Sequence, residues 1–363
     1  MPCRIAIIGA GPAGSAAAIG LARRGFSVTI CERAEFPRDK VCGEFISPAA
    51  THLLESLLPA PELRLLGAHR VREAIVEVGE HQIRWEMPRE AWSLSRRWFD
   101  AELARKASEA GAAVRTGVDV REVSYDQDGV TIELGDGSML DADVVVHADG
   151  LGRHDPAGPT PMRRDVIGLK CRVRPSAPGS GVLFDGVRML SAPGAYIGRV
   201  FSDAASATIA LVARTDLVQR HAPDHDNLVR SLWPRFNPEC RESRWWTCPV
   251  PDSGYITPGH ARSFRIGNAA AAVQPIGGEG IALALWSGTV LGDLLDPGDL
   301  AQTQSLFSRA YRRMLRTRLA TCRASSWLLM RPKLVGSLRP LAAIKPARTA
   351  AFLPWYRLSG KPG

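Results

Sequence analysis

The chain has 363 residues, of which 45% are hydrophobic and 23% charged, as in an ordinary globular protein with one large or two modest domains. It contains no run of about 18 apolar residues, and the first expected strand begins within a few residues of Met1, so we expect neither a transmembrane helix nor a signal peptide. The seven cysteines are scattered and form no C-x-x-C pair, which indicates reduced thiols in a cytoplasmic protein and no metal site.

The positive net charge is concentrated at the end of the chain. No Asp or Glu follows Asp299, whereas Lys and Arg recur throughout residues 301–363. One interpretation is a solvated basic face on terminal helices. The other is contact with an anionic partner, such as a carrier protein bearing phosphopantetheine, a membrane surface or a phosphorylated substrate. Nucleic acid is not expected, because no recognised binding motif accompanies the charge.

The first part of the chain predicts a strand, a glycine turn and a helix. Residues 4–8 form an apolar run typical of a buried parallel strand, and Gly9, Gly11 and Gly14 follow in G-x-G-x-x-G spacing. We expect Gly9 to allow the tight turn, Gly11 to let the backbone approach a pyrophosphate, and Gly14 to let the helix pack on the strand. The free N–H groups at the helix start then face the phosphates.

A helix to about Arg24 and a second strand over residues 26–31 complete this unit. Glu32 ends the second strand, where a carboxylate can accept hydrogen bonds from ribose hydroxyls. A lone glycine fingerprint is a weak signal, but the strand before it, the helix after it and the acid at Glu32 together predict a dinucleotide site.

The nucleotide fold is then interrupted and resumed. Strand-like runs at residues 71–78 and 81–85 start a second sheet, a helix follows at 96–110, and a buried strand at 143–148 returns to the first fold. Later elements are expected as strands at 166–173, 182–184, 196–201, 207–213, 245–250 and 262–266, and as helices at 215–221, 226–236, 279–295 and 301–331. Such an interruption is unusual for a nicotinamide dehydrogenase and common in FAD-binding oxidoreductases.

Four separated motifs carry a family resemblance. They are the glycine fingerprint with Glu32-Arg33, the loop at residues 36–44 with Cys42-Gly43, Ser95-Arg96 before a helix, and the segment 266–281 with Pro275 and a second glycine turn. In this order they resemble the flavoprotein monooxygenase superfamily, and within it the branch close to geranylgeranyl reductases. The similarity covers roughly residues 4–295.

The resemblance implies an α/β (α+β) fold: an FAD-binding Rossmann-like domain interrupted by an antiparallel-sheet substrate domain, then a C-terminal helical, basic segment. The expected FAD-binding domain comprises residues 1–70, 93–160 and 262–298, the substrate domain residues 71–92 and 161–261, and the last segment residues 299–363. The implied FAD contacts are Gly9, Gly11, Pro12, Ala13, Gly14, Glu32, Arg33, Lys40, Cys42, Gly43, Arg96, Asp149, Asn268, Pro275, Gly278, Gly280 and Ile281.

One of these positions departs from the family pattern. The family normally has aspartate where this chain has Asn268, which keeps an acceptor oxygen but loses the charge. We therefore expect FAD binding to survive in weaker form. Asp149 matches the family's Asp-Gly element, although the residues after it differ from the family pattern.

The resemblance implies an NAD(P)H-dependent monooxygenase that hydroxylates an aromatic or polyketide-like small molecule, free or bound to a carrier protein, through a flavin hydroperoxide. Because the sequence holds one glycine fingerprint, NAD(P)H would act as a transient reductant or an external reductase would serve. One alternative is a reductase of prenyl-chain double bonds, which the Cys42-Gly43 loop and residues 278–281 favour. Others are a flavin halogenase, a flavin oxidase or dehydrogenase, and a flavin-binding protein without catalysis. The candidate catalytic residues are Cys42, Glu44 and Tyr196.

Overall fold

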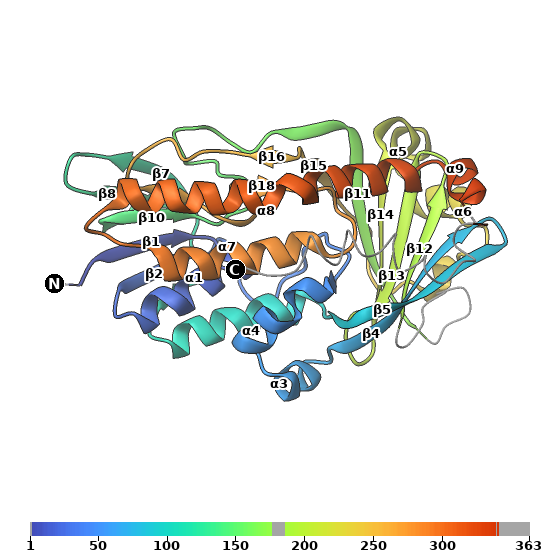
Figure 1. Ribbon diagram of the computed structural model, residues 1–363, viewed down its shortest axis with the longest axis horizontal. Coiled ribbons are helices and arrows are strands. Elements are labelled where there is room, and N and C mark those ends of the chain that lie inside the picture. The colour runs from blue at the N-terminus through green and yellow to red at the C-terminus, as the bar shows by residue number, and fades with distance from the viewer. Residues whose placement is uncertain (1, 176–185, 339, 341–363) are drawn as a thin grey trace.

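The computed structural model describes residues 2–175, 186–338 and 340, and it has a parallel sheet at one end and a larger sheet at the other (Figure 1). The mixed α/β fold predicted from the sequence is confirmed. The division into domains stays a prediction, and residues 182–184 and 341–363 of the expected elements lie outside the described residues.

The parallel sheet is built around the first strand, with the order β17-β10-β1-β2-β6. Its strands are β1 (Arg4–Ile8), β2 (Ser27–Cys31), β6 (Ala113–Arg115), β10 (Val144–His147) and β17 (Ser263–Arg265). Neighbouring strands all run parallel.

Successive side chains of β1 point to opposite faces of the sheet and pack in two different layers. Ile5 and Ile7 join the core that includes the apolar faces of α1 (Pro12–Arg23) and α4 (Arg96–Glu109). Ala6 and Ile8 instead pack against a three-stranded meander. The meander consists of β7 (Val120–Tyr125), β8 (Val130–Leu134) and β9 (Met139–Ala142). The predicted sequence of strand, helix and return strand is therefore confirmed in this half.

The helices α1 and α7 (Glu279–Leu294) approach closely through small residues. The Cα of Gly292 would lie 3.3 Å from a Cβ on Gly20, and a Cβ on Gly288 would lie 2.2 Å from the carbonyl oxygen of Ala13. Only glycine therefore allows this backbone separation at residue 288. The contact sets the second half of α7 against α1, although the two helices are far apart in the sequence.

The second sheet has the order β15-β11-β14-β13-β12-β4-β5-β3. Its strands are β3 (Phe45–Ile46), β4 (His69–Val78), β5 (His81–Ser93), β11 (Met162–Val173), β12 (Gly186–Ala192), β13 (Ala195–Phe201), β14 (Ala207–Arg214) and β15 (Trp246–Pro251). Its pairs are antiparallel as expected, except that β12 pairs with β4 in parallel. A two-stranded sheet of β16 (Gly254–Tyr255) and β18 (Ala271–Ala272) lies apart from it.

Several strands of this sheet differ from the sequence-based expectation, and β12 and β5 differ most. The run at residues 186–192 was not predicted as a strand. β5 continues to Ser93, beyond its expected end at Trp85. Its pairing with β4 is irregular between Glu86 and Ala91 and then resumes. Pro88 falls in this irregularity, where a missing N–H does not interrupt the regular ladder.

Helices cover one face of the second sheet and leave the other for a cavity. Ile197 and Ile209 point toward α5 (Thr215–His221) and α6 (His225–Leu232) in a separate core. Tyr196 and Ala210, which alternate with them, line the cavity.

A long helix, α8 (Leu300–Leu329), runs along the molecule from the parallel sheet to the second sheet (Figure 1). It is followed by α9 (Pro332–Ser337), which contacts β4 and β12. The two remaining helices, α2 (Thr51–Leu57) and α3 (Ala60–Leu65), precede β4. None of the helices in the described part of the chain is both long enough and apolar enough to cross a bilayer.

The contact between α1 and α7 gives a testable expectation. Gly288→Ala should lower the free energy of unfolding by about 1–3 kcal/mol, because the added methyl forces the two helix backbones apart. Thermal and denaturant unfolding measure the change. Gly254→Ala is the matched control, since a Cβ there meets no atom within 4 Å. Equal stability of the two variants would contradict the proposed close contact.

Candidate functional site

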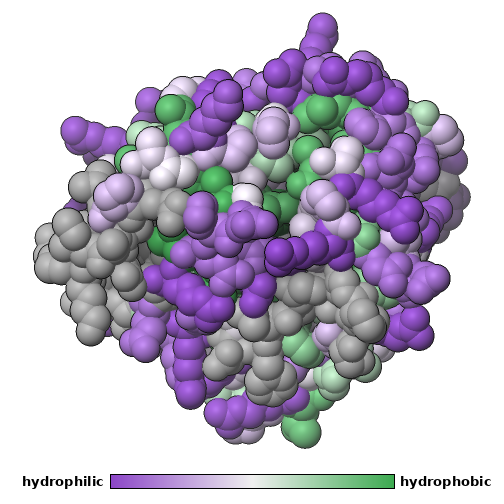
Figure 2. Space-filling view, turned by 90° about the vertical axis from the view of Figure 1, so that its right-hand side faces the viewer, coloured by the Kyte–Doolittle hydropathy of each residue, from purple (hydrophilic) through white to green (hydrophobic). Residues whose placement is uncertain are grey.

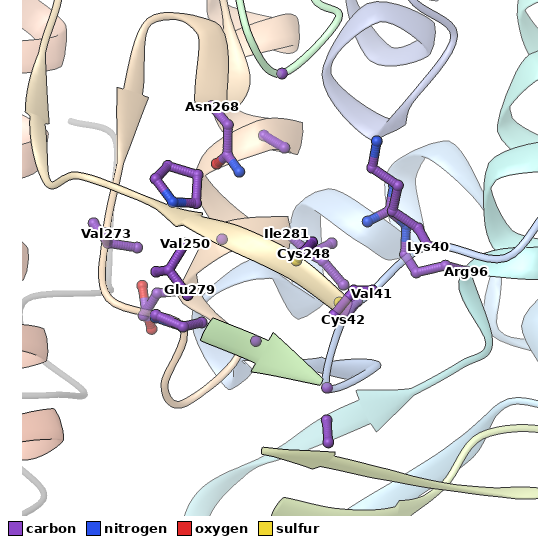
Figure 3. A pocket seen from close by; sticks show the side chains of 18 of the residues that line it. Lys40, Val41, Cys42, Arg96, Cys248, Val250, Asn268, Val273, Glu279 and Ile281 are labelled. Atoms are coloured by element: carbon purple, nitrogen blue, oxygen red, sulfur yellow. The ribbon is translucent and has the colours of Figure 1, made fainter. Parts of the chain in front are cut away.

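A cavity of about 1540 Å³ lies between the two sheets (Figure 3). It begins at the carboxyl ends of β1, β2 and β10, where ligands of open α/β sheets bind, and continues along the second sheet to α8 and α9. Its volume exceeds that of an ordinary small-molecule pocket, roughly 300–1,000 Å³, so it has room for more than one ligand.

The three glycines of the first turn have separate structural roles. A Cβ on Gly9, whose φ is +103°, would lie 2.7 Å from the carbonyl oxygen of Ala148, and one on Gly14 would lie 2.0 Å from the Gly9 carbonyl oxygen. A Cβ on Gly11 would have Arg96 Nη2 as its nearest neighbour, at 3.9 Å. Gly9 and Gly14 are therefore required by the protein itself, whereas Gly11 leaves open space for a ligand, as predicted for a pyrophosphate.

Glu32 is buried at the end of β2 and lines the cavity. Its Oε2 accepts a hydrogen bond from the backbone N–H of Ala10 at 3.0 Å, and its Oε1 accepts one from Ala34 N–H at 3.1 Å. Arg38 pairs with Oε2 at 3.3 Å. These contacts fix the carboxylate beside the glycine turn, in the position expected for a ribose partner.

A cationic cluster of Arg33, Arg38, Lys40 and Arg96 lies on the same side of the cavity. Asp100 holds the Arg96 guanidinium with two hydrogen bonds of 2.6 Å and accepts another from Arg38 at 2.9 Å. Partial burial in the cavity and the nearby Arg96, Arg38 and Arg33 together lower the pKa of Lys40. An anion bound here would relieve this repulsion, so the cluster fits a diphosphate.

The second glycine turn closes on the loop that carries Cys42. Gly278 has a φ of +73°, and a Cβ on it would lie 2.5 Å from the carbonyl oxygen of Phe45. A Cβ on Gly280 would meet no atom within 4 Å, so this residue leaves space at the start of α7. Asn268, on the preceding turn, also lines the cavity (Figure 3).

Glu279, the first residue of α7, was not singled out from the sequence. It is buried, and its carboxylate accepts hydrogen bonds from Ser47 Oγ at 2.7 Å and from Arg318 Nε at 2.8 Å. It also lines the cavity. The ion pair between Glu279 and Arg318 thus joins α8 to the second glycine turn. The sequence offered one signal, an Arg on the buried side of the long helix.

Most of the predicted residues meet at this cavity. Sixteen of the predicted FAD contacts line it, namely Gly9, Gly11, Pro12, Ala13, Glu32, Arg33, Lys40, Cys42, Gly43, Arg96, Asp149, Asn268, Pro275, Gly278, Gly280 and Ile281. The exception is Gly14, which packs α1 against the turn. Their binding to FAD stays a prediction. The space left at Gly11 and the cationic cluster fit the diphosphate of this cofactor, and the space left at Gly280 fits its flavin end, with the helix starts directed toward it.

The candidate catalytic residues are placed differently. Cys42 and Tyr196 line the cavity, and the Tyr196 hydroxyl donates to the carbonyl oxygen of Pro275 at 3.2 Å. Burial raises the pKa of Tyr196, so the phenol stays protonated. Glu44 is buried and does not line the cavity.

Glu44 is occupied by partners from three parts of the chain. Its Oε1 accepts hydrogen bonds from Arg96 N–H at 2.8 Å and from Lys170 Nζ at 2.5 Å, and its Oε2 accepts one from the Thr208 hydroxyl. Lys170 is fully buried too. In this placement the Glu44 carboxylate joins the Cys42 loop to α4 and to the second sheet, which does not favour a role on substrate, and its catalytic role stays a prediction.

The second sheet supplies an apolar wall. The residues of its strands that face the cavity are small or mainly apolar. They are Val76, Gly168, Val187, Met189, Tyr196, Gly198, Ala210 and Val212. Arg199 is turned to the opposite face, where its guanidinium lies 4.3 Å from the Trp233 ring centroid and pairs with Glu77. Beyond the cationic cluster, the cavity therefore favours an uncharged, hydrophobic ligand.

Comparison with known proteins identifies the family. Residues 2–154 match the model of an FAD binding domain. The menaquinone reductase of Mycobacterium tuberculosis is 30% identical over 82% of this chain and 78% of its own length. The chain belongs to the flavoprotein monooxygenase superfamily. The resemblance given by the four motifs is thereby confirmed.

Solved structures of the superfamily share this fold. A geranylgeranyl bacteriochlorophyll reductase-like protein from Thermoplasma acidophilum has a TM-score of 0.80 at 21% identity, covering 97% of this chain and 96% of its own. PqsL from Pseudomonas aeruginosa, described as "a probable FAD-dependent monooxygenase", has a TM-score of 0.76 at 18% identity, covering 93% of this chain and 99% of its own. This flavoprotein is therefore an FAD-binding oxidoreductase of a superfamily whose members catalyse different reactions.

Gly11→Val should abolish FAD binding and leave the fold intact. The valine side chain would fill the space that the structure leaves for the pyrophosphate, and no protein atom lies closer than 3.9 Å to its Cβ. The flavin absorbance and the circular dichroism of the purified variant test both parts. Gly14→Ala is the contrasting control and should impair folding itself. Bound FAD in Gly11→Val would refute the placement.

Lys170→Met tests the role of Glu44. The substitution leaves a buried carboxylate without its cation, so the free energy of unfolding should fall by about 3–5 kcal/mol. Glu44→Gln combined with Lys170→Met should recover part of this loss. Arg4→Met, which breaks the exposed pair with Asp143, should change stability little. A stable but inactive Lys170→Met protein would instead favour a catalytic role for Glu44.

Proposed function

We propose that this flavoprotein is an FAD-dependent reductase that saturates a carbon–carbon double bond in the prenyl chain of a lipid. The observation that supports it best is the apolar wall of the second sheet, which continues the cavity from the predicted flavin site to α8 and α9. A menaquinone reductase with 30% identity agrees with such a substrate class.

FAD, when bound, supplies the hydride for double-bond reduction. The chain's own residues would do the rest. The cationic cluster with Lys40 holds the diphosphate, and the starts of α1 and α7 direct their positive ends toward the cofactor. Gly168, Gly198 and Ala210 leave room for a chain to lie flat along the sheet, where water is excluded.

The reduction also needs a proton, which is added to the other carbon of the double bond. Cys42 lines the cavity and is the candidate donor, since Tyr196 already donates its hydrogen to the Pro275 carbonyl. Glu44 is excluded from this role by its buried ion pair with Lys170. We also propose that NAD(P)H reduces the enzyme transiently, as expected for a chain with one glycine fingerprint.

Hydroxylation of an aromatic or polyketide-like molecule is the second candidate. It is supported by the fold shared with PqsL and by the same water-excluding cavity. Fold alone does not decide between the two reactions, because one fold hosts many chemistries.

The two reactions differ in their products. The FAD-loaded protein should convert a menaquinone with an unsaturated prenyl chain into a product with two more hydrogens when NADH or NADPH is supplied without oxygen. Mass spectrometry of the product measures this. Gain of one oxygen atom, with strict dependence on oxygen and on an aromatic substrate, would overturn reduction in favour of hydroxylation.

A variant on the cavity-facing side of the second sheet tests whether this apolar wall binds the prenyl chain. Ala210→Phe should lower kcat/KM for long prenyl chains about tenfold by filling the space beside the sheet. Ala205→Phe, in the exposed turn before the same strand, is the matched control.

A further inference from the structure

The outward side of α8 and α9 carries a surface patch that the FAD site does not use. Trp327, Leu334 and Leu338 are 52%, 42% and 40% exposed, which is unusual for large apolar side chains. Arg331 and Lys333 are exposed beside them, and the Arg331 guanidinium lies 4.1 Å from the centroid of the Trp327 ring. We call these five residues the α8–α9 patch.

The patch ends a longer exposed stripe. Exposed residues recur every three or four positions along this part of the chain, at Arg316, Ala320, Arg323, Trp327, Arg331, Leu334 and Leu338. The opposite side of α8 is buried against the protein, through residues that include Leu315, Cys322 and Leu329. One side of α8 is therefore buried and the other exposed, as in an amphipathic helix. Along the exposed side the residues are mainly cationic at first and become a mixture of apolar and cationic residues toward the C-terminal end.

The charge of this region favours an anionic partner. Residues 301–363 contain thirteen Lys and Arg and no Asp or Glu, whereas the whole chain has a net charge of +9. The rest of the chain is therefore net acidic, and the terminal segment carries the excess positive charge of the protein.

The patch adjoins the mouth of the cavity. Leu338 belongs both to the exposed patch and to the cavity lining, and Leu328, Leu329 and Val335 line the cavity just inside it. Figure 2 looks onto this end of the molecule and shows hydrophobic residues exposed between hydrophilic ones. A hydrophobic ligand that leaves the patch would enter the cavity without crossing water.

We propose that the α8–α9 patch docks the protein on an anionic lipid bilayer, with the cavity mouth facing the membrane. Exposed Trp and Leu side chains favour the headgroup boundary, and neighbouring Lys and Arg favour anionic lipids. An acidic carrier protein would match the charge alone, whereas a bilayer matches the charge, the exposed Trp327 and the apolar entrance together. The docking proposal rests on the proposed function only for the identity of the lipid that enters the cavity.

Vesicle co-sedimentation of the full, FAD-loaded chain tests the proposal. The protein should sediment with vesicles of equal parts phosphatidylcholine and phosphatidylglycerol, more weakly with phosphatidylcholine alone, and less as salt is raised. Arg331→Gln with Lys333→Gln should weaken binding to the anionic vesicles about thirtyfold, from roughly 1 kcal/mol per cation. Trp327→Ala with Leu334→Ala should weaken binding to both kinds of vesicle.

The matched control is Arg64→Gln with Leu65→Ala on α3. Both residues are exposed, and Leu65 is the most exposed of the large hydrophobic residues in the described part of the chain, at 88%. This variant should bind vesicles like the unchanged protein. The proposal is overturned if the unchanged protein stays in solution with anionic vesicles, or if patch and control variants bind equally. It is also overturned if the patch variants lose self-association, or binding to an acidic carrier protein, without losing vesicle binding.

The outcome is separable from that of the proposed function, because vesicle binding is measured without turnover. Patch variants should reduce a detergent-dispersed substrate at the normal rate and lose activity only on substrate embedded in vesicles. Vesicle binding without any double-bond reduction would leave docking standing and remove the proposed reaction. Double-bond reduction by a protein that does not bind vesicles would support the proposed reaction and overturn docking.

Discussion

The site depends on the close approach of α1 and α7. Each helix starts at a glycine turn, so bringing the two helix backbones together also brings the two turns to one cavity. The glycines at 20, 288 and 292 allow this approach because none has a side chain to separate the helices. Both helix starts then present free N–H groups and partial positive charge to the same volume. A dinucleotide with an electron-accepting ring satisfies that arrangement, with its diphosphate at one helix start and its ring at the other.

Two buried ion pairs hold the remaining parts of the molecule to this centre. Glu44 with Lys170 ties the Cys42 loop to the second sheet, and Glu279 with Arg318 ties the second glycine turn to α8. Buried pairs contribute little net stability, because the removal of two charges from water offsets most of their attraction. Their effect is geometric: each charge is satisfied only when two distant segments are in register. The pairs therefore specify where the sheet wall and the long helix lie relative to the flavin site.

These pairs also show why part of the site could be predicted from the sequence and part could not. The glycine turns were recognisable because their spacing, the strand before and the helix after are all local. The partner of Glu44 lies 126 residues away on β11 of the second sheet, and local pattern carries no information about such a contact. Arg318 looked like one more cation in a basic segment, and only its position on the buried side of the long helix set it apart. The strand at 186–192 was also missed, although its antiparallel hairpin with β13 is local and only its parallel pairing with β4 is far apart in the chain.

Strand alternation explains how one sheet can serve a core and a cavity at once. On β13, Tyr196 and Gly198 face the cavity while Ile197 packs toward α6, and β14 repeats this with Ala210 and Ile209. The packing of α5 and α6 constrains one set of positions, and the other set is free to suit the ligand. Relatives can therefore share the whole fold and differ in reaction, because the cavity-facing residues change without disturbing the core. In this chain those residues are small or apolar along the full length of the wall, and that composition, more than the fold, is the reason to expect a hydrophobic chain beside the flavin.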